Sequence, residues 1–217
     1  MNSLTPFHTI RILTRCEVSL HQDSSCAIHV DEPDDVAEWI DYHVENGELI
    51  IQTKPMHYGF LLLHDSYPNI QLACTHLNGI QLFNRANITS PERLRVEKLG
   101  VIIRQDGTVE LNVDALRVDC TILKRGHIKV AGETIETFLR VYHDGWYDGA
   151  SLQASTGMVY LTNNARASVW INGEMEARIL GRSRFSYRGT PRFSWLSVDE
   201  GCRVEPLQGT AEEKPAM

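Results

Sequence analysis

The chain is built from short stretches in which apolar and polar residues alternate. Between residues 10 and 20 the even positions are apolar except Thr14, and the odd positions are polar except Leu13. Side chains that alternate between two sides with a period of two are typical of a strand that buries one face. The break at Leu13 and Thr14 indicates a bulge or a corner. A second strand is predicted over residues 26–30.

A helix and a hairpin are predicted next. Asp34 and Asp35 precede residues 36–40 and could cap one or two helical turns there. Asn46-Gly47 separates two strand-like runs, 42–45 and 48–51. This pair is a strong hairpin signal because both residues tolerate a positive φ.

From about residue 70 the alternating segments shorten, and a glycine, asparagine or aspartate separates them. Gly173, Gly181 and Gly189 lie eight residues apart. In this region the positions predicted to face inward are all odd: Ala167, Val169, Ile171, Ala177, Ile179, Phe185 and Tyr187. A chain that turns every eight residues or so favours a β-solenoid. A β-sandwich of short strands is the competing interpretation.

These patterns predict one all-β domain over residues 1–207. Residues 6–54 form an N-terminal capping unit of strand, short helix and hairpin, and residues 70–206 form the coils. The segment 208–217 has no apolar periodicity and is expected to be a mobile tail.

Composition and charge exclude several classes of protein. The chain has 217 residues and a formal net charge of −7, which argues against general nucleic-acid binding. No apolar run approaches the roughly 18 residues of a transmembrane helix. The first residues resemble no signal peptide, so the protein is cytoplasmic if this start is genuine. The five cysteines have no metal-ligand spacing, and we expect buried free thiols.

Several segments resemble the head GIN domain family of bacterial auto-transporter adhesins. They are residues 6–10, 18–22, 27–30 and 46–51, the segment 146–152, and the run Phe185-Ser186-Tyr187-Arg188-Gly189-Thr190-Pro191. The resemblance covers most of residues 6–206. It implies a right-handed parallel β-helix-like solenoid, located at the cell envelope or secreted. It carries no catalytic residue over to this chain.

No nucleotide-binding, hydrolase or metalloprotease motif is present. The nine histidines are scattered, and we expect neither a metal nor a cofactor. One local candidate for sugar chemistry stands at 142–149, where aromatic residues lie beside carboxylates. Its candidate binding residues are His143, Asp144, Trp146, Tyr147 and Asp148. The alternative is a corner whose rings pack into the core.

The charges are unevenly distributed. Residues 18–52 contain nine acidic residues and neither lysine nor arginine. Residues 177–198 contain no acidic residue and five arginines, all at even positions: Arg178, Arg182, Arg184, Arg188 and Arg192. Because the odd positions there are apolar, these arginines are predicted to form one outward basic stripe. Solvated faces that protect strand edges are the simpler explanation.

The leading hypothesis is a non-enzymatic binding or structural module of the cell envelope, with the five arginines as its contact face. The stripe could bind anionic glycans or lipid headgroups. It could also attract the acidic N-terminal region of another copy, which would give head-to-tail homo-oligomers. The alternative is a carbohydrate-active enzyme or glycan-binding β-helix that uses residues 142–149.

Overall fold

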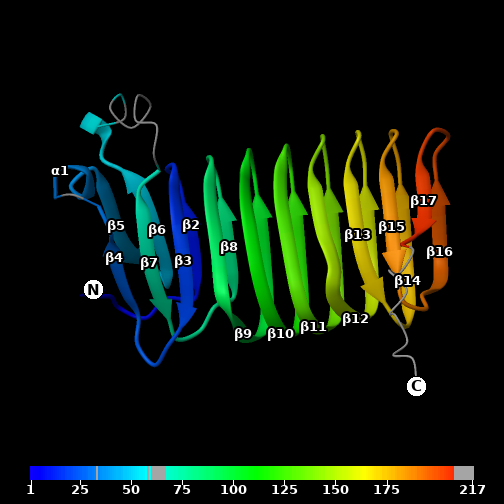
Figure 1. The fold of residues 1–217 in the computed structure, drawn as a ribbon, viewed down its shortest axis with the longest axis horizontal. Coiled ribbons are helices and arrows are strands. Elements are labelled where there is room, and N and C mark those ends of the chain that lie inside the picture. Colours follow the sequence, from blue (N-terminus) through cyan, green and yellow to red (C-terminus); the bar gives the residue numbers. More distant parts are fainter. Residues whose placement is uncertain (33, 58, 60–66, 208–217) are drawn as a thin grey trace, which may run out of the picture.

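The chain winds into a flattened β-solenoid of about seven turns (Figure 1). The computed structural model describes residues 1–32, 34–57, 59 and 67–207. The tail predicted over 208–217 therefore lies outside the described residues. Neighbouring coils pair through parallel strands, which excludes the β-sandwich and confirms the predicted solenoid.

The described residues before residue 86 form the following strands and short helices. They are β1 (Asn2–Ser3), β2 (Thr9–Ile12), β3 (Cys16–Gln22), β4 (Ala27–Val30), α1 (Asp34–Ala37), β5 (Ile40–Glu45), β6 (Glu48–Thr53), the 3-10 helix η1 (Pro55–His57), β7 (Asn69–Cys74) and β8 (Gly79–Leu82). The coils that follow contain β9 (Ala86–Ile103), β10 (Gly107–Ile122), β11 (Gly126–Val141), β12 (Trp146–Leu161), β13 (Arg166–Ile171), β14 (Glu174–Ile179), β15 (Arg184–Arg188), β16 (Arg192–Val198) and β17 (Arg203–Pro206).

Each long strand folds over in its middle and contributes to two sheets. In β10 the buried positions are odd up to Ala115 and even from Val118, so the alternation changes phase at a bend. The first half of β12 pairs with β13 and its second half pairs with β14. We call the sheet that holds β13, β15 and β17 the first sheet, and the sheet that holds β14 and β16 the second sheet. The buried residues of both sheets belong to one hydrophobic core.

The predicted inward positions lie in this core. Of the seven odd positions, six are buried and Tyr187 packs against the core while partly exposed. The apolar face follows from simple alternation, because each strand has one side toward the opposite sheet. The cysteines also follow the prediction: all five are free thiols, and all but Cys202 are buried.

The predicted corner, helix and hairpin near the N-terminus are present. The chain turns between β2 and β3, where the buried side chains of Thr14 and Thr53 share a hydrogen bond. Helix α1 is a single turn that begins at Asp34 and ends at Ala37, so Asp34 and Asp35 lie within it instead of preceding it, and Ile40 already belongs to β5. β5 and β6 form an antiparallel hairpin, and its turn residues Asn46 and Gly47 have φ values of 51° and 75°.

The strand order near the N-terminus does not follow the chain. β2 pairs with β6 on one side and with β8 on the other, and β3 lies between β7 and β9. Antiparallel strands, β4 beside β7 and β5 beside β6, form the N-terminal end of the solenoid (Figure 1). The expected division into a capping unit over 6–54 and coils over 70–206 stays a prediction.

Candidate functional site

The segment 142–149 divides between the surface and the core. His143 and Asp144 form an exposed turn with φ values of 44° and 61°, and Trp146 begins β12 with 49% of its surface exposed. Tyr147 is only 1% exposed. It cannot contribute to a contact surface because the alternation along β12 points it inward. Burial raises the pKa of its hydroxyl well above the usual value.

The two carboxylates of this segment have different surroundings. Asp148 accepts hydrogen bonds from Ser168 Oγ at 2.9 Å and from the Ala150 backbone N–H at 3.2 Å. Asp144 lies four residues earlier in the sequence, at the rim of a groove described below. Asp148 does not line that groove. The geometry therefore does not aim both carboxylates at one shared position, as acid/base catalysis on a glycosidic bond requires.

The five arginines predicted to form one stripe do not share a face. Arg184 and Arg188 lie on β15 in the first sheet, whereas Arg178 and Arg192 lie on β14 and β16 in the second sheet. Arg182 lies in the turn between them, with a φ of 64°. The single stripe is wrong because a period of two separates inside from outside but does not tell which of two sheets a strand joins.

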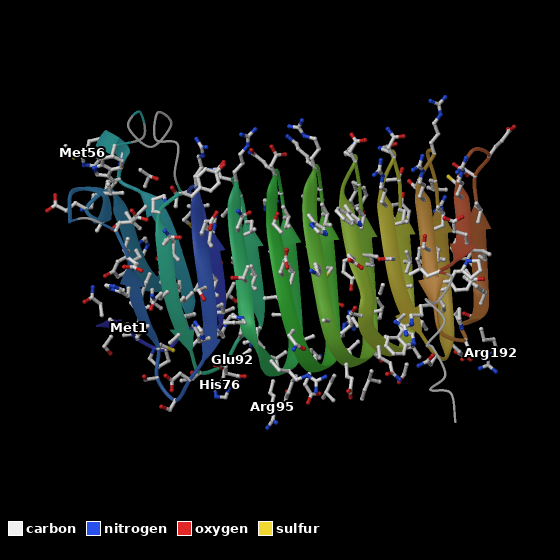
Figure 2. The ribbon with its side chains drawn as sticks, in the orientation of Figure 1. Met1, Met56, His76, Glu92, Arg95 and Arg192 are labelled. Carbon is white, nitrogen blue, oxygen red and sulfur yellow. The ribbon has the colours of Figure 1, made fainter. Side chains whose placement is uncertain are left out.

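Two of the arginines make contacts of their own. The Arg188 guanidinium lies 4.3 Å from the centre of the Trp170 ring, and Arg192 is bonded to Glu174 at 2.5 Å. Figure 2 shows the Arg192 side chain projecting from the C-terminal part of the solenoid. These contacts explain the positions of the Arg188 and Arg192 side chains without a ligand.

Strand register brings Arg184 into a row on the first sheet. His127, Trp146, Arg166, Arg184 and Arg203 are direct partners in successive strands, from β11 to β17. All five begin or nearly begin their strands and face outward, since the residue after each is an inward-facing one. Three arginines thus lie side by side, about 4.8 Å apart along the solenoid.

A groove of about 460 Å³ runs along this row. One side is formed by row residues and the other by turn residues, each two positions earlier in its own coil. Its lining residues are Arg125, Gly126, His127, Asp144, Trp146, Asn164, Arg166, Arg182 and Arg184. We call it the arginine groove. It combines four guanidinium groups with a single carboxylate.

The turns that line the groove are tied to one another. The Asp144 N–H donates to the Asn163 carbonyl at 3.0 Å, and the Asn164 N–H donates to the Gly181 carbonyl at 2.9 Å. Asn163, Asn164 and Arg182 all have positive φ, which asparagine tolerates better than arginine does. The backbone therefore holds Arg182 in place at the rim of the groove.

The arginines of the groove differ in how they are compensated. Arg125 forms an ion pair with Asp106 at 3.4 Å. Within the part of the chain that the structure describes, no carboxylate lies within ion-pair distance of Arg166, Arg182 or Arg184. The groove therefore carries three arginines without ion-pair partners, on a protein whose formal net charge is −7.

An aromatic stack stands at one end of the groove. The rings of His127 and Trp146 are parallel within 7°, with centroids 4.0 Å apart. Desolvation lowers the pKa of His127, against the opposing effect of the nearby carboxylates of Asp148 and Glu110. His127 is thus mainly neutral near pH 7, and the stacked Trp146 keeps 49% of its surface exposed.

Comparison with known proteins assigns the chain to a family. A family model described as "Putative auto-transporter adhesin, head GIN domain" matches residues 6–191. The chain belongs to this family. No curated protein matches this chain.

Solved structures share the fold at low sequence identity. An adhesin described as putative, from Bacteroides fragilis NCTC 9343, has a TM-score of 0.85 at 16% identity and covers 94% of both chains. Two proteins from Parabacteroides distasonis ATCC 8503 also match at 16% identity and 94% coverage of both chains. One is described as a putative adhesin, with a TM-score of 0.70, and the other as a putative lipid binding protein, with a TM-score of 0.66. These likenesses show the fold of the head GIN domain alone.

Two further features concern the described residues of this head GIN domain: groups that could hold a metal ion and helices that could span a membrane. Its described histidines, cysteines and carboxylates form no group of three or more that could hold a metal ion. None of its described helices is long and apolar enough to span a bilayer.

Sequence reasoning missed five residues of the groove: Arg125, Gly126, His127, Asn164 and Arg166. The signal that could have found them is a spacing close to 19. The row residues 127, 146, 166, 184 and 203 are separated by 19, 20, 18 and 19 positions in the sequence. The eight-residue glycine spacing reflects half a coil of the head GIN domain and hides this longer period.

Proposed function

We propose that this head GIN domain is a non-catalytic binding module of the bacterial cell envelope whose arginine groove holds an acidic glycan. The observation that supports the proposal is the row of in-register arginines without carboxylate partners. Like charges directly opposite each other on neighbouring strands destabilise a sheet, by up to about 1 kcal/mol per pair. A bound anion removes this cost, because it contacts several guanidinium groups at once.

The chemistry of the groove suits carboxylate or sulfate groups on a sugar. A guanidinium presents a planar fork of donors that binds such oxyanions in a bidentate manner. Asn164 and Asp144 at the rim can exchange hydrogen bonds with hydroxyl groups. The exposed face of Trp146 offers a platform on which an apolar sugar face can stack.

The shape of the groove favours an extended ligand. It crosses four coils, which corresponds to a length of about 14 Å at roughly 4.8 Å per strand. Positive charge recurs along that length at Arg125, Arg166 and Arg184. An isolated ion would engage one or two of these groups, whereas a linear acidic oligosaccharide can engage all of them. An anionic lipid headgroup is the alternative source of the same chemistry.

The proposal is tested by binding to defined surfaces. We expect retention on immobilised heparin and polygalacturonate but not on neutral dextran. Arg166→Gln with Arg184→Gln should weaken binding at least about tenfold, since one charge-assisted hydrogen bond is worth about 1.5–3 kcal/mol. The matched control is Arg178→Gln with Arg188→Gln, which removes the same charge outside the groove and should leave the affinity within about twofold.

The remaining outcomes separate the alternatives. Equal losses in both double variants would mean that net charge, not the groove, drives binding. Retention on phosphatidylglycerol vesicles but on neither acidic polysaccharide would assign the groove to lipid headgroups. New reducing ends released from polygalacturonate would show that the domain is an enzyme and not only a binding module.

A further inference from the structure

The last coil leaves an interior face of the second sheet open. Leu196 and Val198 of β16 continue the buried rows of Ala177 and Ile179, which are their register partners in β14. Ala177 and Ile179 are 1% and 0% exposed, whereas Leu196 and Val198 are 44% and 43% exposed. Among the described residues, no further strand pairs with the far edge of β16. Figure 1 shows β16 and β17 at one end of the solenoid, opposite the end that holds β5.

The open edge also offers backbone hydrogen-bonding groups. The Asp199 N–H donates to the Ile179 carbonyl at 2.9 Å, so residue 199 points its backbone toward β14. By alternation, Ser197 points the same way, and Leu196 and Val198 point their N–H and C=O groups outward. Residues 193–198 contain no charged side chain. Such an edge is a template for another strand unless it is blunted by charge, proline or a cover.

The end strand of the first sheet carries a charge pattern that complements itself. Arg203 and Glu205 lie two residues apart on β17 and face outward. The Arg203 N–H donates to the Ser183 carbonyl at 3.0 Å, so Val204 between them points its backbone groups to the open edge. In an antiparallel pair of two β17 strands centred on Val204, each Arg203 lies opposite the Glu205 of the other strand.

One symmetry axis satisfies both sheets. Glu200 and Gly201 are the middle of the turn between β16 and β17. Ser197 lies three residues before Glu200, and Val204 lies three residues after Gly201. Ser197 and Val204 therefore lie at the same height, one in each sheet. A two-fold axis through both residues places Leu196 opposite Val198 of the other copy. The same axis centres the β17 pair on Val204. It also joins the apolar rows of Leu196 and Val198 from the two copies.

We propose that a second copy of this chain docks on the open end, with β16 against β16 and β17 against β17 around this two-fold axis. The outward backbone groups of Leu196, Val198 and Val204 are satisfied in both copies. The interior side chains at the end of each solenoid become buried. The contact is isologous, so it closes at a dimer.

The opposite end of another copy is the poorer partner. Its edge strand β5 carries Asp41, His43 and Glu45 between its apolar residues. Pairing with β5 would place two carboxylates beside the uncharged stretch of β16. The final coil moreover carries Asp199, Glu200 and Glu205 beside Arg192 and Arg203, so it is not the basic end that the head-to-tail hypothesis requires.

The dimer is expected to be weak. A seven-residue strand is about 23 Å long and two packed sheets are about 10 Å apart, which gives an end face of roughly 230 Å² per copy. The total is well below the roughly 1,200 Å² buried in stable complexes. We therefore expect a dimer that forms only at high protein concentration.

The test is sedimentation velocity of the full chain from about 5 µM to 1 mM. The unmodified chain should shift from one chain mass toward two as the concentration rises. Leu196→Lys with Val198→Lys should keep it monomeric throughout. The matched control is Leu116→Lys, which replaces a leucine of similar exposure, 53%, at a bend far from the open end.

A charge exchange tests the two-fold axis itself. Arg203→Glu alone places Glu against Glu205 of the other copy and should weaken the dimer at least tenfold. Arg203→Glu with Glu205→Arg restores opposite charges and should recover the dimer to within about threefold of the unmodified chain. Both residues are exposed, so this pair of variants stays informative if the lysine variants fail to fold.

Three results would overturn the proposal. They are a monomer at every concentration, a series of species larger than a dimer, and a double exchange that stays as weak as Arg203→Glu. A series of larger species would indicate pairing with β5 in a head-to-tail manner.

Discussion

Two arginines on β15 are predicted to affect stability in opposite directions. Arg184 lies between Arg166 and Arg203 in the register of the first sheet, and Arg188 lies four residues further along the same strand. We expect Arg184→Gln to raise the free energy of unfolding and Arg188→Gln to lower it. Both variants keep a long polar side chain and remove one positive charge.

The magnitudes follow from the contacts. Two unit charges about 4.8 Å apart in water repel each other by about 0.9 kcal/mol, and measured cross-strand pairs contribute about 0.2–1 kcal/mol. Removal of Arg184 relieves two such contacts and should stabilise the chain by about 1 kcal/mol. Arg188 loses its position over the Trp170 ring, an exposed cation–π contact worth about 0.5–1 kcal/mol. The two variants should therefore differ by about 1.5–2 kcal/mol.

The assay is thermal and urea unfolding at low and high salt. For a chain of this size 1 kcal/mol shifts Tm by about 2–4 °C, so the two variants should differ by about 3–8 °C. In 1 M salt the Debye length is about 3 Å, and the gain from Arg184→Gln should largely vanish. The reasoning would be refuted if Arg184→Gln destabilises the chain as much as Arg188→Gln at low salt.

Four further predictions concern the groove, the pH dependence of stability, a glycine within β11 and the thiols. Acidic-glycan affinity should rise as the pH falls from 7 to 5, because protonation adds a positive charge at His127; a profile unchanged by His127→Gln would contradict this. The pKa of His127 is lowered in the folded chain, so its contribution to stability is complete above the unfolded value of 6.5 and is lost as the pH falls below it, which pH-dependent unfolding measures. Gly132→Ala should lower the unfolding free energy by at least about 2 kcal/mol, since φ is +113° and the new Cβ would lie 2.0 Å from the Val113 carbonyl oxygen, whereas Gly100→Ala should be mild. Cys16 should resist thiol reagents at pH 8 because burial raises its pKa to about 12, while the partly exposed Cys202 reacts; rapid labelling of Cys16 in the folded state would count against the buried core.

The sequence predicted the elements of the fold more fully than their arrangement. Alternation identified the buried side of each strand, and Asn46-Gly47 identified the hairpin, because both signals are local. Register between coils is not local. The placement of Arg166 beside Arg184 depends on a degenerate period of 18 to 20 residues that no single segment displays.

The candidate site was predicted only in part, because the position of its residues also depends on register between coils. Asp144, Trp146, Arg182 and Arg184 stood among the candidates and lie together in the groove. Tyr147 did not reach the surface, although it adjoins Trp146, because neighbouring strand residues face opposite ways. His127 could not be recognised from its neighbours, since its stacking partner lies 19 residues away in the sequence.

The position of β2 and β3 inside the solenoid has a consequence for biosynthesis. β2 precedes β6 and β8 in the chain, so both of these strands must be made before β2 has its two neighbours. The emerging chain must therefore hold an apolar strand with an unpaired edge until about residue 82. From β9 onward each new coil adds to one already in place, so growth becomes sequential. Deletion from the N-terminus would consequently open a gap inside the stack, whereas deletion from the C-terminus would only shorten it.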